Sequence, residues 1–595
     1  MKALRLTSLT GKEWRFFEHD GAKALYMRQL YGISDLQARV ALMRGIGPED
    51  YRQYADPTLR DLMPDPYVLK DMRAATEHVA GAVEEGRAVG VIGDYDVDGA
   101  TSSAVLALVF RAIGTQCEVF IPDRAEDGYG PCNRAFDRFL ALGIRDALTV
   151  DCGATAFAPL AYAESLGIRT VVLDHHAGAE SLPPARAVVN PNRQDETGAY
   201  GYLAAVGVTF LFAVALCREL RLRGYFAAKA IPEPDLRSLL DVAALGTVCD
   251  VVPLVGLNRA FVRQGLKIMA RRGNVGLSAL IDVAGVKDAP DAYHLGFVLG
   301  PRINAGGRVG DSGLGVALLT SQDSLEAASI AQRLHAYNEE RKALEKLALE
   351  EAESQIDAGD VAAPMLFAAS RDWHEGVIGI VAGRLKDKYH RPVAVLSLKD
   401  GVAKASARSI EGANVGAAIL AAKDAGLLIA GGGHAMAGGF SVREADMDAL
   451  ASFLRDFLKQ AVERNAVPVF TPDAVAALAG VDLKTAEELE ACAPYGAANP
   501  KPRFVFSGAR ILSVDILGGA HYRCLLRDAH RDKGGCVKAM AFRADGSALG
   551  DALRACVGKV VAVAGTLNVN RWKGAATIDV HIDDVALQET FEACR

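Results

Sequence analysis

Acidic and histidine side chains follow three separate apolar stretches of this chain. The runs are Asp94, Asp96 and Asp98 after residues 89–92, Asp151 after residues 147–150, and Asp174, His175 and His176 after residues 170–173. Short β-branched runs between helical segments are typical of buried parallel strands. The carboxyl ends of such strands meet at one edge of an α/β sheet, where open sheets bind their ligands. The sequence therefore predicts that these acids and imidazoles converge on one edge.

Carboxylates gathered in this way repel one another unless cations lie between them. The alternative for Asp-x-Asp-x-Asp-Gly is a calcium-binding EF-hand loop, but that loop needs an acid at its last position, here Val105, and a helix before it. Carboxylates alone favour Mg²⁺, and an imidazole such as His175 shifts the preference toward Mn²⁺. His176 is adjacent to His175, so we expect one of the two to bind an ion and the other to donate to a phosphate oxygen.

Alternation along an extended segment predicts that Asp94, Asp96 and Asp98 share one face, with Gly99 turning the chain into a helix near Thr101. A further acid, Asp250, stands among apolar residues, where an unpaired carboxylate is costly. The residues alone favour two interpretations of Asp250 equally: it is a metal ligand, or it accepts a hydrogen bond at a helix end. Two ions at this edge would activate water and stabilise charge on a phosphate, so no serine or cysteine nucleophile is needed. A purely structural acidic cluster is disfavoured because the strand-end placement recurs three times.

Bulk properties exclude several other classes of protein. A chain of 595 residues is too long to fold around a single hydrophobic core. Half of its residues (50%) are apolar, and the formal net charge is −7. A general polyanion binder is disfavoured, although a local basic groove can lie on an acidic body. Ten cysteines without a Cys-x-x-Cys pair indicate neither a zinc knuckle nor a disulfide framework. An early charged N-terminus and an apolar stretch (202–217) too short to span a bilayer predict a cytoplasmic protein without membrane contact.

Changes of pattern along the chain predict its organisation. We expect an N-terminal cap of charged helices (1–55), an α/β phosphoesterase domain (56–320), a connecting helix (321–358), a second α/β domain (359–465), a Pro/Gly-rich linker (466–503) and a terminal β-barrel (504–595). The expected fold is therefore α/β, with two α/β lobes joined by a long helix and a C-terminal barrel of the OB type.

These motifs resemble those of the DHH phosphoesterase superfamily, which takes its name from an Asp-His-His motif like Asp174-His175-His176 of this chain. The resemblance continues through Gly93–Ser102, Ala244–Pro253, Gly300–Arg308, Trp373–Arg384, Ser406–Ser409 and the glycine cluster Gly431–Gly439 of the DHH-associated domain. With the linker 493–502 and the terminal barrel, the chain is similar to the bacterial single-strand-specific exonucleases of that superfamily.

This resemblance implies two Mn²⁺ or Mg²⁺ ions in a cleft between the lobes. Asp94 and Asp96 would bind one ion, Asp98, His175 and Asp250 the other, Asp151 would bridge both, and His176 would contact the scissile phosphate. Pyrophosphatase relatives carry a histidine two residues before Asp94, where this chain has Ile92. The shell of the first ion is the part that this departure puts in doubt.

Further substrate contacts are expected outside the metal ligands. Arg408 and Ser406 would hold a terminal phosphate, with backbone N–H groups of the Gly431 cluster, Gly432 included, facing the anion. Arg302, Asn304 and Arg308, expected in a Gly-rich loop, would contact the phosphodiester. His374 and His434 are equally substrate contacts or satisfied loop histidines. On the barrel, Arg571, Trp572 and Lys573 suit a stacking surface for single strands, or else a solvated hairpin.

The expected function is a metal-dependent exonuclease that degrades single-stranded DNA from its 5′ end to mononucleotides in recombination and repair. The alternative is a phosphodiesterase of the same superfamily acting on short oligonucleotides or cyclic dinucleotides, but such proteins usually lack the barrel. A non-catalytic scaffold is disfavoured by the intact ligand set. We expect a monomer with a single-strand-binding protein and a helicase as partners, and the polarity and the DNA substrate follow from the resemblance alone.

Overall fold

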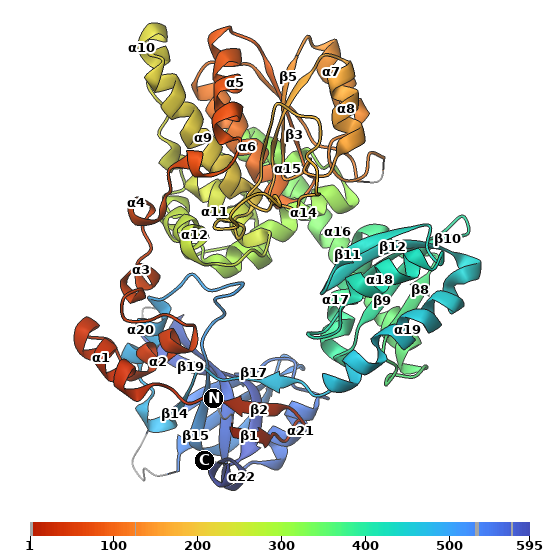
Figure 1. The fold of residues 1–595 in the computed structure, drawn as a ribbon. Coiled ribbons are helices and arrows are strands. Elements are labelled where there is room, and N and C mark those ends of the chain that lie inside the picture. Colours follow the sequence, from red (N-terminus) through yellow and green to blue (C-terminus); the bar gives the residue numbers. More distant parts are fainter. Residues whose placement is uncertain (1–3, 125, 530–534, 573–574, 595) are drawn as a thin grey trace. The chain divides into compact units, whose positions relative to one another are not determined.

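The computed structural model describes residues 4–124, 126–529, 535–572 and 575–594 (Figure 1). The chain divides into two compact units, one of residues Asp56–Ala343 with Pro494–Pro500, and one of Met1–Ala55, Leu344–Ala493 and Lys501–Arg595. Across the described ranges, no helix combines the length and the apolar character that crossing a membrane requires.

A five-stranded parallel sheet organises the unit that contains residues 56–343. Its strands, in the order β4-β3-β5-β6-β7, are β4 (Cys117–Phe120), β3 (Val89–Gly93), β5 (Asp146–Val150), β6 (Arg169–Leu173) and β7 (Ala187–Val189). Gly93 pairs with Val150, and Val150 pairs with Leu173, so three strands end at the same level. The predicted strand ends are therefore confirmed, and the loops that follow them start side by side.

Alternate residues of these strands pack against opposite layers of helices. Val91 and Leu148 face a core shared with the first layer, whereas Ile92 and Ala147 face a core shared with the second. The first layer is α5 (Met72–Glu84), α6 (Val97–Ala112) and α9 (Ala205–Leu222), and the second is α7 (Asn133–Ala141) and α8 (Phe157–Ser165) (Figure 1). Because both faces are covered, most residues in the middle of these strands are apolar, and the loops after the strand ends are free for polar chemistry.

Further helices extend the first layer beyond the sheet. They are α4 (Leu59–Leu62), α10 (Tyr225–Lys229), α11 (Leu240–Cys249), α12 (Gly256–Met269), α13 (Val275–Val283), a π-helical turn (His294–Leu299), α14 (Gly300–Val309) and α15 (Leu314–Thr320). The sequence analysis is wrong about α14, which it expected to be a Gly-rich loop. Its glycines permit close packing: a side chain at Gly300 would clash with Cys249, and one at Gly307 with the backbone of Tyr95.

A single helix, α16 (Ser324–Asp357), continues from this unit into the other, which confirms the predicted long helix. The second α/β domain follows it, with a mixed sheet in the order β11-β12-β10-β9-β8. Its elements are β8 (Leu366–Ser370), α17 (Glu375–Tyr389), β9 (Val393–Lys399), β10 (Val402–Arg408), α18 (Val415–Asp424), β11 (Ala430–His434), β12 (Ala437–Arg443) and α19 (Met447–Arg464). Helix α17 packs on one face of the sheet, and α18 and α19 pack on the other.

The C-terminal part is a β-barrel, as predicted. Its strands are β14 (Ala474–Ala477), β15 (Arg503–Leu517), β16 (His521–Asp528), β17 (Cys536–Ala541), β18 (Val560–Trp572) and β19 (Ala575–Leu587). They follow the order β14-β15-β16-β17-β19-β18, and pairing of β15 with β18 closes the sheet. The helices here are α20 (Leu483–Glu490), α21 (Ala548–Ala555) and α22 (Gln588–Ala593). Strand β14 and α20 lie in the expected linker 466–503, which is thus more structured than its Pro/Gly content indicates.

The N-terminal residues pack on this barrel. The helices α1 (Gly21–Tyr31), α2 (Asp35–Met43) and α3 (Tyr51–Ala55) agree with the expected helical patterns. Two strands precede them, β1 (Leu4–Thr7) and β2 (Glu13–Phe16), which pair with each other, and β2 also pairs with β13 (Val469–Phe470). The fully buried Trp14 donates its indole N–H to the carboxylate of Asp584 at 2.8 Å. A strand near the start of the chain is thereby fixed to the last strand of the barrel. The domain boundaries themselves stay predictions.

Candidate metal centre

The acids of the first motif lie on a loop and the helix that follows it. Asp94 directly follows β3, and Asp96 is the N-cap of α6, where its carboxylate accepts the N–H groups of Asp98 and Gly99 at 2.8 and 3.1 Å. The helix begins at Val97, so the prediction of one extended face with a helix from Thr101 is wrong. Gly99 lies inside the first helical turn, and this position requires glycine because a side chain there would clash with the backbone of Asp94.

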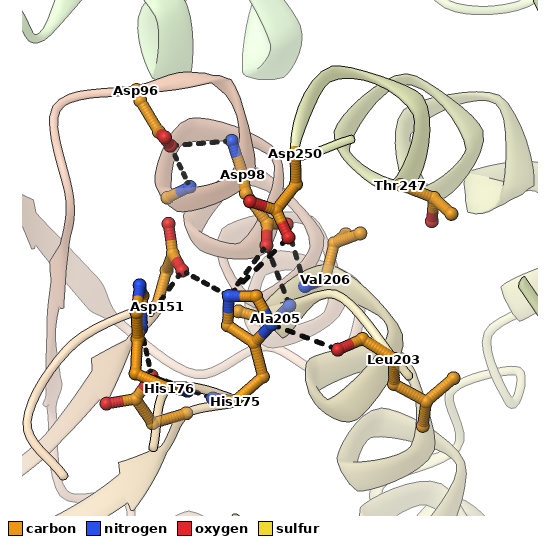
Figure 2. A network of polar contacts seen from close by, with 12 residues as sticks. Asp96, Asp98, Asp151, His175, His176, Leu203, Ala205, Val206, Thr247 and Asp250 are labelled. Atoms are coloured by element: carbon orange, nitrogen blue, oxygen red, sulfur yellow. Dashed lines mark hydrogen bonds and ion pairs between the residues drawn. The ribbon is translucent and has the colours of Figure 1, made fainter. Parts of the chain in front are cut away.

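Asp98 is fully buried and joins α6 to α9. Its two carboxylate oxygens accept the backbone N–H groups of Ala205 and Val206 at 2.7 and 2.9 Å (Figure 2). These N–H groups open α9, whose N-cap residue Ala204 has no side-chain acceptor, so Asp98 supplies the cap from another helix. Burial and the neighbouring Asp96 raise the pKa of Asp98 to about 7.

Asp151 follows β5 in a left-handed backbone conformation, with φ of 60°. Non-glycine residues seldom adopt this conformation, and it recurs at functional sites. Its carboxylate is buried, and the Oδ1 atom has no hydrogen-bond partner. Burial, together with the charges of Asp98, Asp96 and Asp94, raises the pKa of Asp151 well above its usual value.

His175 points one ring nitrogen at the acids and anchors the other. Its Nδ1 lies 3.0 Å from the carbonyl oxygen of Leu203, to which a neutral imidazole donates (Figure 2). Its Nε2 lies 3.4 Å from Asp151, 3.5 Å from Asp250 and 3.9 Å from Asp98. Burial lowers the pKa of His175, so the ring is neutral and its Nε2 presents a lone pair. This is the arrangement by which histidine binds a metal ion.

Asp250 is the C-cap of α11, and its side chain is one-fifth exposed. Its Oδ2 has no hydrogen-bond partner, and burial with the charges of Asp98 and Asp96 raises its pKa to about 9. The next residue, Val251, has φ of 61°, which is strained for a β-branched side chain. The structure therefore places Asp250 beside Asp98 and His175 rather than in a capping hydrogen bond.

Two groups of ligand atoms are close enough to surround an ion each. The carboxylates of Asp94, Asp96 and Asp151 form one group, and Asp98, His175 and Asp250 form the other, with the ligand atoms of each group within 4.8 Å of one another. Asp151 joins His175 and His176 in a third group, so it stands at the junction. The buried Oδ1 of Asp94 also has no partner, and burial raises the pKa of Asp94 to about 8.

This donor set fits divalent cations. Unpaired oxygens of the acids and one imidazole nitrogen point at the same space, and carboxylate with imidazole suits Mn²⁺ and Mg²⁺. Burial, and after it repulsion among the carboxylates, raises the pKa values of these acids, and a cation between the groups would favour their charged forms. Ile92, at the position of the missing histidine, is a buried strand residue that faces the core shared with α7 and α8.

His176 and the neighbouring Asp174 act differently. Asp174 is buried and accepts the N–H groups of Ala154, His175 and His176 at 2.8, 2.7 and 3.2 Å, and lies 2.8 Å from His176 Nδ1. Burial alone would lower the pKa of His176, but the hydrogen bond and charge of Asp174 outweigh it and raise this pKa. With a half-exposed ring, His176 can donate a proton or a hydrogen bond to an anion.

Several residues that the sequence analysis gave no role support this centre. Asp174 orients both histidines, and the side chains of Asn190 and Asn192 bind the backbone carbonyls of His176 and His175. The hydroxyl of Tyr129 donates to the carbonyl of Asp151 at 3.1 Å and lies 3.2 Å from His176 Nδ1. Asn190 follows β7 directly, so the strand-end rule that found the acids could have found it.

The arginines of α14 lie in different surroundings. Arg302 is 8% exposed, donates to the carbonyl of Val298 at 2.6 Å and lies 3.3 Å from His335. Burial and the positive charges of Arg124 and Arg341 lower the pKa of Arg308 to about 10. Asp96 and Tyr95 oppose that shift, which places Arg308 within electrostatic reach of the first metal motif. Asn304 lies on the same helix and is half-buried.

In the second α/β domain, the predicted anion contacts lie on strands and one helix end. Arg408 at the end of β10 donates to Ser406 Oγ at 3.1 Å and to the carbonyl of Ala407 at 2.9 Å. His374 is exposed and is the N-cap of α17, accepting the N–H of Gly376. His434 ends β11 and accepts from Met436 at 3.3 Å. Gly432, on the edge strand β11, has open space where a side chain would be.

On the barrel, Arg571 near the end of β18 forms ion pairs with Glu490 at 3.0 Å and Glu487 at 3.9 Å. Trp572 is the last described residue of that strand, and Lys573 lies outside the described residues. Two further polar side chains of the barrel also have partners: Arg523 forms an ion pair with Asp515, and Asn570 donates to the carboxylate of Asp579.

Comparisons with known proteins agree with this geometry. Residues 88–247 match the DHH family, N-terminal domain, residues 361–460 the DHHA1 domain, and residues 472–584 the RecJ OB domain. The parallel sheet with its carboxylate–histidine centre, followed by a DHHA1 domain, thus defines a protein of the DHH class.

Longer matches specify the family. The single-stranded-DNA-specific exonuclease RecJ of Dickeya dadantii is 36% identical over 573 residues, which are 94% of this chain and 95% of the relative. The crystal structure of RecJ from Thermus thermophilus in complex with Mn²⁺ matches with a TM-score of 0.79 at 28% identity, covering 96% of this chain and 79% of that one. Its Mg²⁺ complex matches with a TM-score of 0.73 at 27% identity over 96% and 78%. This chain belongs to the RecJ family.

Proposed function

We propose that this chain is a divalent-metal-dependent exonuclease that hydrolyses single-stranded DNA from its 5′ end to mononucleotides, in recombination and repair. The observation that carries the proposal is the pair of ligand groups joined at Asp151, whose unpaired atoms face one another. The activity printed in the relatives' names, single-stranded-DNA-specific exonuclease, supports the substrate. The polarity is inferred from the resemblance of the motifs.

The chain's own residues would hold and orient the reacting groups. When bound, two Mn²⁺ or Mg²⁺ ions would lower the pKa of water and stabilise negative charge on the phosphate. Asp94 and Asp96 would hold one ion, Asp98, His175 and Asp250 the other, and Asp151 both. His176, whose pKa the hydrogen bond and charge of Asp174 raise, would donate a hydrogen bond to a phosphate oxygen.

Residues of the second α/β domain would bind the 5′-terminal phosphate. Arg408 lies beside Ser406 on β10, so a guanidinium and a hydroxyl present adjacent donors. Arg308, near the first metal motif, would neutralise phosphate charge, and Arg302 would act as a helix-embedded support for it. His374 and His434 each already accept a backbone N–H, which favours their being satisfied loop histidines.

A labelled single-stranded DNA oligomer tests this proposal directly. With Mn²⁺, a 5′ label should appear at once in a mononucleotide, while a 3′ label should pass through a shortening ladder. The reverse pattern would overturn the polarity, and no cleavage of either strand would overturn the exonuclease. The same reaction with Asp151→Asn is the control for a contaminating nuclease.

The alternative function is a phosphodiesterase for short oligonucleotides or cyclic dinucleotides. The described barrel, matched by the RecJ OB domain, favours a longer strand over such substrates. Turnover of dinucleotides without digestion of the long strand would select the alternative. A single-strand-binding protein and a helicase remain proposed partners, and we propose a monomer that works in the cytoplasm.

A further inference from the structure

Arginines stand at the starts of four neighbouring strands of the parallel sheet. Arg87 lies two residues before β3, Arg145 directly before β5 and Arg186 directly before β7, and Arg169 is the first residue of β6. These strands are consecutive in the sheet, and the metal centre lies beyond their other ends. At about 3.3 Å per residue, the five residues of β5 separate the two edges by roughly 16 Å. The arginines thus gather at the edge opposite to the acids.

Two of these arginines neutralise a buried acid. Asp146, the first residue of β5, has a side chain that is 2% exposed and accepts from Arg87 and Arg169 at 2.8 Å each. Arg87 also forms an ion pair with Glu85. The pair with Asp146 holds Arg169 in place, although its side chain is still 33% exposed. A guanidinium that is fixed and partly exposed loses little side-chain freedom when it binds a further anion.

The remaining two arginines, Arg145 and Arg186, are exposed at the same edge. Backbone hydrogen bonds of 2.8 Å join the N–H of Arg169 to the carbonyl of Arg145, and the N–H of Arg186 to the carbonyl of Thr170. Arg145 also donates from its side chain to the carbonyl of Leu166 at 2.5 Å. In the part of the chain that the structure describes, neither Arg145 nor Arg186 has a carboxylate within 4.0 Å. Like charges gathered in this way repel one another, and an anion between them relieves the repulsion.

A cavity of about 520 Å³ opens among these side chains. Arg145, Arg169 and Arg186 line it together with Glu164 of α8, and residues 167–168, 170 and 184–185 complete its walls. Its volume lies in the range of about 300–1,000 Å³ that is typical of small-molecule sites. Because three arginines and one acid line this space, it attracts an anion, and its hollow shape suits a small molecule better than an extended strand.

We propose that this cavity binds a phosphorylated small molecule, with Arg145, Arg169 and Arg186 on its phosphate. A planar guanidinium matches two phosphate oxygens at once, and charge-assisted hydrogen bonds of this kind are strong. The carboxylate of Glu164 only accepts hydrogen bonds, so it suits a hydroxyl or amino group on the remainder of the ligand. Sugar phosphates and nucleoside monophosphates combine these groups. The site goes beyond the proposed function, because neither the metal ions nor a DNA strand takes part in it.

Calorimetric titration of the full chain tests this site. Chelator keeps divalent metal away, and an Arg408→Ala background removes the phosphate contact proposed in the second α/β domain. The probes are inorganic phosphate and dAMP, and binding of either should also raise the melting temperature as its concentration increases. Arg186→Ala should weaken binding about tenfold, because it removes charge-assisted hydrogen bonds to the phosphate. The absence of both heat and a melting shift with either probe at millimolar concentration would overturn the proposal.

Arg138→Ala is the matched control, because Arg138 is exposed on α7 of the same domain and forms an ion pair with Glu118. This variant should bind both probes as the background protein does. Equal weakening by Arg138→Ala and Arg186→Ala would indicate attraction by surface charge in general and would overturn the site. Folded Arg145→Ala and Arg186→Ala variants that both bind the probes unchanged would overturn it as well.

The two probes and Glu164→Gln separate the phosphate from the rest of the ligand. Glu164→Gln should strengthen the binding of inorganic phosphate, because one repelling charge is gone. Tighter binding of dAMP than of inorganic phosphate would show that the nucleoside enters the cavity, and equal binding would show that the phosphate alone is held. Either result supports the site.

A fluorescent single-stranded oligomer distinguishes a small-molecule site from a path for nucleic acid. If Arg186→Ala weakens binding of the oligomer and leaves dAMP binding unchanged, the edge contacts a strand and the proposal is overturned. All of these titrations are made without divalent metal, so their outcome does not depend on whether the chain hydrolyses DNA.

Discussion

The two α/β sheets of this chain present their polar side chains in different ways. In the parallel sheet, Asp94, Asp151 and His175 stand on loops just beyond strand ends, and each has a buried atom without a hydrogen-bond partner. In the mixed sheet, Arg408 lies on a strand and His374 caps a helix, and both bond to groups of their own domain. The first arrangement is incomplete without a cation, whereas the second is satisfied and must exchange hydrogen bonds to bind an anion. We therefore expect a cation to bind more strongly at the parallel sheet than an anion binds at the mixed sheet.

The strongest test of this difference is Asp151→Asn. Asp151 belongs to one ligand group and lies 3.4 Å from His175 of the other. Loss of its carboxylate should therefore weaken the hold on both ions and lower kcat at least about 10³-fold. The metal-free variant should unfold at the same or a higher temperature than the wild type, since one repelling charge is gone. Retained activity in the Mn²⁺ assay would refute a centre that depends on Asp151.

Asp174→Asn should have the next largest effect. It keeps the shape but weakens the orientation of His176 and lowers the pKa of its ring, so activity should fall about 10- to 100-fold with the metal affinity less affected. The pH–rate profile provides the decisive measurement, because the limb that reports a protonated group should move to lower pH. An unmoved profile with reduced activity would indicate a purely structural role.

Stability of the metal-free protein should depend on pH in an unusual direction. The pKa values of Asp94, Asp98 and Asp250 are raised to about 8, 7 and 9, so the folded state holds protons that the unfolded state releases near pH 4. The free energy of unfolding therefore falls as the pH rises from about 4 to 9. Each kcal/mol lost should lower the melting temperature by roughly 2–4 °C. Melting curves with chelator should show this fall, and added Mn²⁺ should remove it. A pH-independent chelated protein would contradict the proposed repulsion.

Arg408→Ala examines the satisfied site. Loss of the guanidinium should reduce the preference for a 5′-phosphorylated strand about tenfold, while hydrolysis of an unphosphorylated strand changes little. Arg371→Ala is the matched control, because Arg371 is exposed in the same domain and pairs with Glu444. Equal losses on both strands would remove Arg408 from end recognition.

The smallest effect concerns His374. His374 is the N-cap of α17, so His374→Ala should lower the free energy of unfolding by about 1 kcal/mol, whereas His374→Asn should keep the wild-type value. Hydrolysis should be unchanged in both variants. If His374→Asn is stable but slow, the histidine contacts the substrate after all, and the contrast between the two sheets is weaker than described.

The sequence allowed the strands of the parallel sheet and the convergence of their acids to be predicted, because strands covered on both faces must be apolar and end in polar residues. The glycines misled the same reasoning. Gly99, Gly300 and Gly307 were taken as signs of turns, yet all three lie in helices where another segment packs too closely for a side chain. Close approach between segments distant in sequence leaves the same residue type as a turn, so sequence pattern alone does not separate them.

The supporting residues escaped for a related reason. Asn190 and Asn192 act through backbone carbonyls, and Asp98 caps a helix more than a hundred residues away in the chain. Partners of this kind depend on tertiary structure, and nothing in the local pattern marks them. On the barrel, Arg571 was expected on a stacking surface for single strands or on a solvated hairpin, and its ion pair with Glu490 of α20 could not be foreseen from the local pattern.

The bond from Trp14 to Asp584 has a consequence for the order of events during translation. The two residues are 570 positions apart, so at about 5–20 residues per second the ribosome needs roughly 30–110 s to deliver the partner. Until then the indole and the paired strands β1 and β2 have no barrel to cover them. A nascent chain stalled before residue 584 should therefore expose this segment to proteases and chaperones, and completing the barrel should be the event that protects the oldest part of the polypeptide.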